Sequence, residues 1–167
     1  MIRSSMAIMF TLLLLVMAGT VGAEMAKEGS GDYLSAKTSV SEVVAMGKER
    51  LQMNFDQDGV VVKAPENSPL HNASFRALGT LHAIKGKYKG SGFVVWTRPN
   101  DDKVYATFET EGAFRGDTKS ILTFVGGTGT CAGIQGTLEI TRIPGLKRSR
   151  KGVSPGISIG EFSWKIP

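Results

Sequence analysis

From Tyr33 onward, apolar side chains recur at every second position, and this two-residue period constrains the fold more than any other feature. Successive side chains of a β-strand point to opposite faces, so a period of two is the pattern of a strand. The alternating runs are rich in Thr, Val, Ile and aromatic residues, which favour strands. Gly, Pro, Asn and Asp interrupt the runs at short intervals, as in sandwiches and barrels. The pattern therefore predicts an all-β domain.

The interruptions divide the chain into eight expected strands, or nine if the second is split at an Asp-Gly turn at 56–59. In chain order the expected strands cover 34–46, 49–55 with 60–62, 72–86, 92–98, 103–112, 119–125, 134–143 and 157–165. The short connections suit hairpins, so sequential neighbours should pair antiparallel. Eight such strands can close into a calycin-like up-and-down barrel, because closure removes the exposed edges. A β-sandwich is the alternative architecture.

The first 23 residues have the pattern of a secretory signal peptide. Arg3 precedes an apolar run at 6–17, and small residues at 21–23 end the segment. The run is shorter than the roughly 20 residues that a membrane-spanning helix needs. We expect cleavage after Ala23, a secreted or periplasmic protein, and no transmembrane span in the mature chain. Residues 24–32 are expected to be a flexible leader, and residues 33–167 a single domain.

The charge distribution argues against nucleic-acid binding. The chain carries a net charge of +5, and four positive charges lie together in the expected loop 144–156. These four are Lys147, Arg148, Arg150 and Lys151. Acidic and basic residues nearly balance elsewhere, whereas a nucleic-acid-binding domain usually has a basic stripe on one face. The chain has one Cys and two His residues without the spacing of metal ligands, so neither a metal site nor a cofactor is predicted.

The most distinctive segment is a glycine-dense hairpin at 126–136, which has five glycines in eleven residues and alternating strands on both sides. It resembles the GGTGxxAGxxG hairpin of allene oxide cyclase-like and dirigent-like barrels. The resemblance implies an eight-stranded barrel over residues 34–165 that works mainly by shaping a hydrophobic pocket. Plant members cyclise a lipid epoxide or steer radical coupling. No further catalytic pattern of the plant cyclases can be matched in this sequence.

Three residues are candidates for catalysis. Glu109 and Glu111 share one face of their expected strand with Tyr105. If this face points inward, a carboxylate in an apolar interior can act as an acid or a base with a raised pKa. The alternative is a solvated outer face, which Lys103 on the same face favours. Cys131 is either a thiol that faces the pocket or a small buried hydrophobic residue.

Five residues are candidates for lining a ligand cavity. Arg76 and His82 share a strand face, so both are possible interior polar groups. Trp96, Tyr105 and Phe124 lie inside expected strands and are candidates for an aromatic lining, which is usual for small-molecule sites. The alternative for the aromatic residues is a filled core.

Three functions remain open at this stage. The leading hypothesis is an exported barrel that binds a small hydrophobic molecule without turnover. The second is a cofactor-independent cyclase or isomerase of the allene oxide cyclase type. The third is a structural or interaction protein that uses the barrel surface or the loop 144–156. A homo-oligomer is compatible with each of them.

Overall fold

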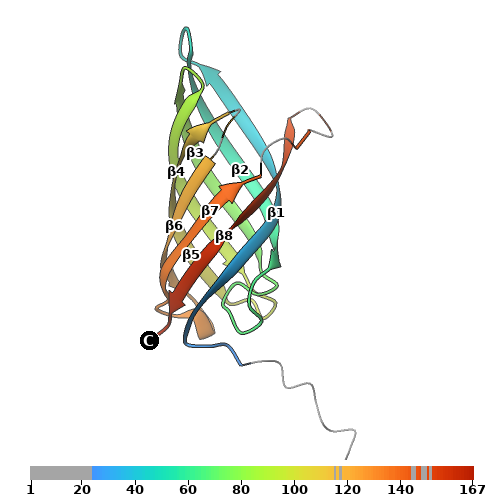
Figure 1. Ribbon diagram of the computed structural model, residues 1–167, viewed down its shortest axis with the longest axis vertical. Coiled ribbons are helices and arrows are strands. Elements are labelled where there is room, and N and C mark those ends of the chain that lie inside the picture. The colour runs from blue at the N-terminus through green and yellow to red at the C-terminus, as the bar shows by residue number, and fades with distance from the viewer. Residues whose placement is uncertain (1–23, 115, 117, 144–145, 148–149, 151) are drawn as a thin grey trace, which may run out of the picture.

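The computed structural model describes residues 24–114, 116, 118–143, 146–147, 150 and 152–167. They form a closed barrel of eight antiparallel strands in sequence order (Figure 1). The strands are β1 (Glu28–Ala45), β2 (Arg50–Lys63), β3 (Ser74–Ile84), β4 (Lys87–Thr97), β5 (Lys103–Ala113), β6 (Thr118–Gly127), β7 (Gln135–Arg142) and β8 (Val153–Lys165), with a short 3₁₀ helix, η1 (Gly129–Cys131), between β6 and β7. Because β1 pairs with both β2 and β8, the barrel has no free edge strand. The predicted up-and-down barrel is confirmed.

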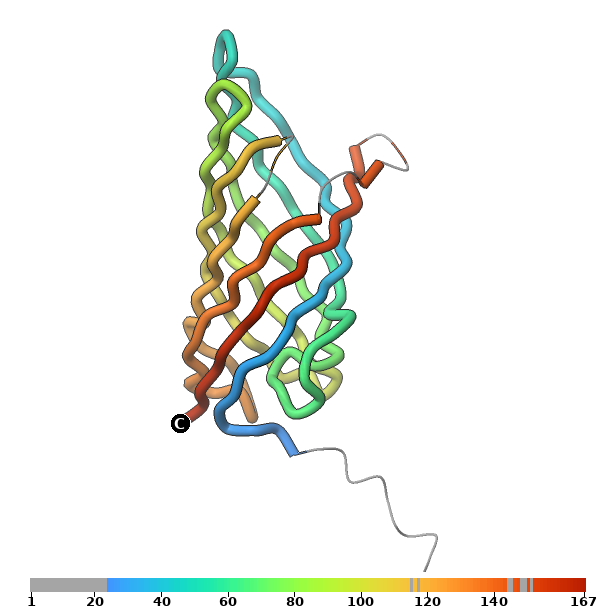
Figure 2. The backbone as a smooth tube through the Cα atoms, viewed as in Figure 1, coloured from blue at the N-terminus to red at the C-terminus, as the bar shows by residue number. Residues whose placement is uncertain are grey.

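The two ends of the barrel differ in their connections (Figures 1 and 2). At the end that we call the open end lie the connections β1–β2, β3–β4, β5–β6 and β7–β8. The β1–β2 hairpin extends furthest there, as the tube in Figure 2 shows. The connections β2–β3, β4–β5 and β6–β7 lie at the opposite end, which we call the closed end, together with the C-terminus and the start of β1. In the described part of the chain, no helix is both long and apolar enough to cross a membrane.

Inward-facing side chains fill the closed half of the barrel with an aromatic core. The Trp96 ring packs edge-on against Phe124, with centroids 5.9 Å apart, and Phe162 stacks on Trp164 at 5.1 Å. Segments outside the strands seal the closed end, and their side chains are almost completely buried. These residues are Leu70, Ala73, Cys131 and Ile134.

The glycine-dense hairpin is fastened to the β4–β5 connection at the closed end. The carboxylate of Asp102 accepts hydrogen bonds from the amide of Thr130 at 2.9 Å and from its hydroxyl at 2.5 Å. The backbone of β6 passes so close to η1 that a Cβ on Gly127 would lie 2.5 Å from the carbonyl oxygens of Lys103 and Cys131. Only glycine fits at this position, which explains part of the glycine density that the sequence displays.

Residues 24–32 do not form the flexible leader that the sequence predicts. Strand β1 begins at Glu28, which pairs with Lys165 of β8. Ahead of the strand, the carbonyl of Ala26 accepts a 2.9 Å hydrogen bond from the Trp164 indole, and Met25 packs on the core. The polar residues of this segment gain backbone partners along β8, and tertiary pairing outweighs their weak local preference for a strand.

The predicted turn at 56–59 was also wrong, because β2 runs through it without interruption. Asp56 pairs with Val40 of β1, and its carboxylate forms an ion pair with Arg76 of β3 at 2.6 Å. A Cβ on Gly59 would lie 2.5 Å from the ring of Phe75. An Asp-Gly sequence favours a turn locally, but here partners on both sides hold it extended.

Strand β4 begins at Lys87, earlier than the predicted residue 92. Lys85 and Gly86 have φ angles of 51° and 78°, which suit a two-residue hairpin turn. Because the turn takes up only two residues, the Gly- and Lys-rich residues that follow it pair with β3.

Candidate functional site

The open half of the barrel contains an internal chamber of about 490 Å³, lined by inward-facing residues of all eight strands. Volumes of this size are typical of sites for small organic molecules. Buried side chains of the core form its deep side, and they include Tyr33, Phe75, Val94, Trp96 and Leu138. Phe114, which follows β5, and Leu146, which follows β7, also line the chamber. The chamber is therefore apolar at its deep side and extends toward the open end of the barrel.

A pair of glycines shapes one wall of the chamber. Gly79 of β3 and Gly92 of β4 lie opposite each other in the sheet. A Cβ on either residue would lie 2.6 Å from the tip of the Phe108 ring, so the ring rests directly against bare backbone. Phe55 stacks on Phe108 with centroids 6.0 Å apart. The two rings make this wall of the chamber aromatic.

Polar side chains line the chamber toward the open end. Ser39, Ser41 and Gln57 project from β1 and β2. On the other side, the Ser120 hydroxyl donates a 2.8 Å hydrogen bond to the Thr110 hydroxyl. The chamber thus changes from aromatic at its deep side to hydroxyl-lined near its entrance.

Two cationic side chains, Lys37 of β1 and Arg142 of β7, also line the chamber. Burial lowers the pKa of Lys37 to about 8, and the positive charge of Arg142 acts in the same direction. No Asp or Glu is among the described residues that line the chamber. Within the described chain, neither cation has a carboxylate within salt-bridge distance. The described lining of the chamber therefore carries positive charge and no negative charge.

Two of the aromatic residues predicted to line the cavity, Trp96 and Phe124, point inward, but they lie at different depths in the barrel. Trp96 lines the chamber, and its indole nitrogen lies 3.4 Å from the hydroxyl of Tyr33. Burial raises the pKa of the Tyr33 phenol, and hydrogen bonding to Ser35 and Trp96 opposes this effect. Phe124 is buried in the core below the chamber, where it touches Trp96 and does not line the open space.

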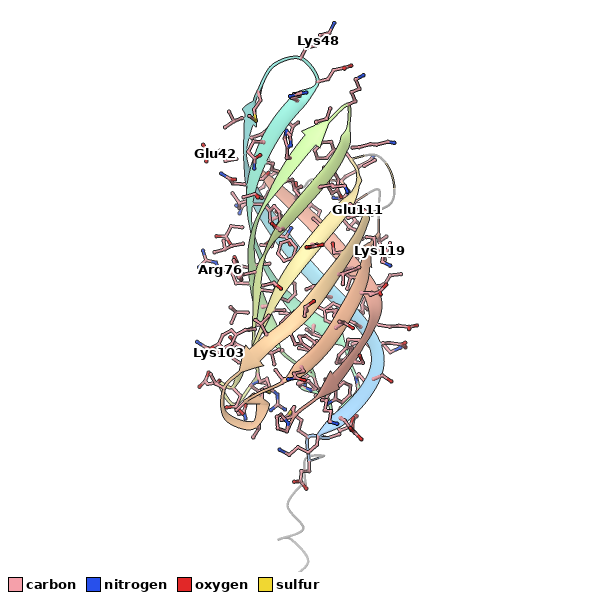
Figure 3. All side chains as sticks on the ribbon, turned by 90° about the vertical axis from the view of Figure 1, so that its left-hand side faces the viewer. Glu42, Lys48, Arg76, Lys103, Glu111 and Lys119 are labelled. Atoms are coloured by element: carbon pink, nitrogen blue, oxygen red, sulfur yellow. The ribbon has the colours of Figure 1, made fainter. Side chains whose placement is uncertain are left out.

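The predicted carboxylates are not at the chamber. Glu109, Glu111 and Tyr105 project from the outer face of β5, because Phe108 on the same strand points inward. Glu111 lies 3.5 Å from the ammonium of Lys89 on the outer surface (Figure 3). The structure thus favours the solvated outer face over the inward one, and neither glutamate is positioned to act on a molecule in the chamber.

Arg76 and His82 were also predicted as possible interior groups, and both lie on the outer face of β3. Arg76 extends away from the barrel wall (Figure 3) and binds Asp56 with two hydrogen bonds, of 3.0 and 2.6 Å. This pairing raises the pKa of Arg76 and lowers that of Asp56. The inner face of β3 belongs instead to Phe75, Ala77 and Leu81.

Cys131 is buried in η1 at the closed end, outside the residues that line the chamber. Its sulfur lies 4.0 Å from that of Met25. Burial raises the pKa of the thiol, and the charge of Arg98 only partly opposes this effect. A buried thiol with a raised pKa is a poor nucleophile, so the alternative of a small hydrophobic residue fits its surroundings.

Lys37, Gln57, Tyr88 and Arg142 line the chamber and were not predicted. Lys37 has the same strand parity as Tyr33, which is buried. A Lys in phase with a buried aromatic residue is a signal that the sequence does contain. The predicted basic loop cannot be compared fully, because Arg148 and Lys151 lie outside the described residues. Among the described residues, no group of three or more His, Cys, Asp or Glu converges as a metal site.

Fold and site together define a closed antiparallel barrel with an internal chamber that opens at one end. Among solved structures, the barrel is similar to the pterocarpan synthase dirigent protein GePTS1, with a TM-score of 0.52 and 12% sequence identity over 85% of this chain and 88% of that one. The chain therefore has the dirigent-like β-barrel fold, and the predicted resemblance is confirmed at the level of the fold. No protein-family model matches the sequence. A comparison with curated proteins likewise gives no match.

Proposed function

We propose that this protein is exported and that it binds a small, largely hydrophobic molecule inside the barrel. The observation that carries the proposal is the chamber of about 490 Å³ with its aromatic deep side. An eight-stranded barrel is wide enough either to be packed solid or to hold one small ligand. Here the closed half is packed and the open half is hollow. Apolar surface in such a chamber favours a ligand that removes it from water.

Binding is preferred to catalysis because of the residues that surround the chamber. The cyclase hypothesis depended on Glu109, Glu111 and Cys131, and none of them lines it. In the described part of the chain, the titratable groups that line it are Lys37, Arg142 and the phenols of Tyr33 and Tyr88. Hydroxyl, amide and aromatic groups make up most of the remainder, and these groups orient a ligand without supplying acid–base chemistry.

The proposal can be tested with N-phenyl-1-naphthylamine, a neutral fluorophore that brightens in apolar surroundings. We expect saturable binding to the mature protein. A Leu81→Trp variant should lose it, because Leu81 points into the chamber and a larger ring fills the space. A matched control is His82→Trp, one residue along β3 and on its outer face, which should bind as the wild type does. Absence of binding, or equal binding by Leu81→Trp, would contradict the proposal.

Export is tested separately, by expressing the full chain in a secreting host. The mature protein should begin at Glu24, as determined by mass spectrometry of the secreted product. Retention of residues 1–23 on the purified protein would refute this part of the proposal.

A further inference from the structure

None of the described residues that line the chamber carries a negative charge to balance its positive charge. Lys37 and Arg142 are the charged side chains among the described residues that line it, and both are cationic. Arg142 is exposed, but Lys37 is partly buried, and a buried charge is normally paired because desolvating it is costly. An anion in the chamber would supply the missing partner.

The register of the strands brings the two cations to the same side of the chamber. Lys37 of β1 lies opposite Gly156 of β8, and Arg142 of β7 lies opposite Ser158, two residues further along β8. Both side chains therefore flank one short stretch of a single intervening strand. The charge of Arg142 helps to lower the pKa of Lys37, which agrees with this proximity.

Gly156 gives Lys37 its path toward Arg142. A Cβ on Gly156 would lie 3.1 Å from both Cγ and Cε of Lys37, so the stem of the lysine crosses bare backbone. A larger residue at this position would push the stem aside. Glycine in a strand interior often marks such a close approach.

We infer that the ligand of this chamber is an amphipathic organic anion, whose apolar body lies against Trp96 and Phe75 and whose acidic group binds Lys37 and Arg142. This inference rests on the proposed binding function and adds the chemical class of the ligand. Guanidinium and ammonium groups form strong charge-assisted hydrogen bonds with carboxylate and related anions. The nearby hydroxyls of Ser39 and Ser154 are further donors for the same group.

A matched pair of probes separates the anionic group from the apolar body. The two probes are 1-anilinonaphthalene-8-sulfonate and N-phenyl-1-naphthylamine, which share one ring system and differ in the sulfonate. We expect the sulfonate probe to bind the wild type more tightly than the neutral probe. Lys37→Met and Arg142→Met should each weaken sulfonate binding about tenfold, the loss of one charge-assisted hydrogen bond. The same variants should still bind the neutral probe, with a much smaller change in affinity, which also shows that they are folded.

A third variant controls for the long-range effect of removing one positive charge. Lys89→Met removes a cation from the outer surface, where Lys89 faces Glu111, and should leave sulfonate binding unchanged. If the wild type binds both probes equally, or if Lys37→Met and Arg142→Met have no effect on the sulfonate probe, the inference is overturned and the binding function stands. If neither probe binds the wild type, the binding function fails and the inference fails with it.

Discussion

The phenol of Tyr88 and the hydroxyl of Thr118 form a hydrogen bond of 2.5 Å near the open end of the barrel. Tyr88 belongs to β4 and Thr118 to β6, so the bond passes over the intervening strand β5 inside the barrel. The ring of Phe114, which follows β5, lies against Tyr88 with centroids 5.2 Å apart. These three residues all line the chamber. These contacts fix the positions of the three side chains near the open end of the chamber.

Replacing Tyr88 with Phe should destabilise the protein by about 0.5–1.5 kcal/mol, the usual net contribution of one hydrogen bond. The ring remains in place, so the change isolates the hydroxyl that bonds Thr118. Urea unfolding followed by tryptophan fluorescence measures the difference. Tyr105→Phe is the matched control, because Tyr105 is on the outer face of β5, and it should have no measurable effect. Equal stability of the two variants would contradict the role given to the bond.

A second prediction concerns the glycine wall of the chamber. Gly92→Ala should destabilise the barrel by about 1–3 kcal/mol, the typical cost of overpacking. The new methyl group would meet Phe108 at 2.6 Å and the backbone carbonyl of Leu78. Gly116→Ala is the control, since a Cβ there finds only an ordinary contact of 3.5 Å with Ala113. Thermal unfolding of the two variants tests the prediction, and a Gly92→Ala variant as stable as wild type would refute it.

The barrel could be predicted from the sequence because its two-residue period recurs in every strand and its connections are short. Which face of each strand points inward was harder to determine. In β1, Val40 and Val44 are more than half exposed, whereas Ser39 and Ser41 line the chamber. In the hollow half of the barrel, polar side chains face the interior and apolar side chains face outward. The alternation of apolar residues alone therefore predicts the wrong inner face there.

The prediction of the site residues depended on which face of each strand points inward, and the sequence alone does not determine this. Glu109 and Arg76 were predicted as site residues because they are charges within apolar strands. Both side chains lie on the outer face of the barrel, in contact with solvent. By their chemistry, Lys37 and Arg142 were equally suited to bind a ligand. Only the closed barrel shows that their strands, β1 and β7, flank the same strand, β8. Their proximity depends on pairing between the two ends of the chain, which local sequence patterns do not encode.

A third prediction concerns Asp102, which fastens the glycine-dense hairpin. Hydrogen bonds from Thr130 hold the pKa of Asp102 below its ordinary value of 3.8. A lowered carboxyl pKa stabilises the fold above the unfolded value, and this stabilisation is lost as the pH falls through the folded value. Asp102→Asn should therefore lower the melting temperature at pH 7 and have less effect below pH 3.8. Asp101→Asn is the control and should be neutral at both pH values; equal effects of the two changes would contradict the prediction.

A fourth prediction concerns the cost of burying Lys37. Its pKa is lowered from 10.5 to about 8, first by burial and then by Arg142. The folded protein therefore binds fewer protons than the unfolded chain between these values, so the contribution of Lys37 to stability rises with pH across this range. Lys37→Met should be more stable than the wild type at pH 7, and its advantage should shrink between pH 8 and 10.5. Chemical denaturation at several pH values measures it, and a constant difference would refute the assignment.

The fifth prediction links the same titration to the binding of an anion. Protonated Lys37 attracts the sulfonate of 1-anilinonaphthalene-8-sulfonate, so affinity should fall as the pH rises above about 8, where Lys37 loses its proton. One linked proton limits the change to about tenfold per pH unit. Lys37 pairs with Gly59 of β2 and Gly156 of β8, and the other charged side chain among the described residues that line the chamber is Arg142.

Burial raises the pKa of Tyr33, which shares the inner face of β1 with Lys37, so this phenol stays neutral in the same range. Lys37 is then the group whose titration alters the binding of the sulfonate between pH 7 and 9. Lys37→Met should bind the sulfonate probe with an affinity that does not change over this range, and the neutral probe should bind the wild type equally at each pH. A wild-type affinity for the sulfonate that is constant from pH 7 to 9 would show that Lys37 does not bind the anion.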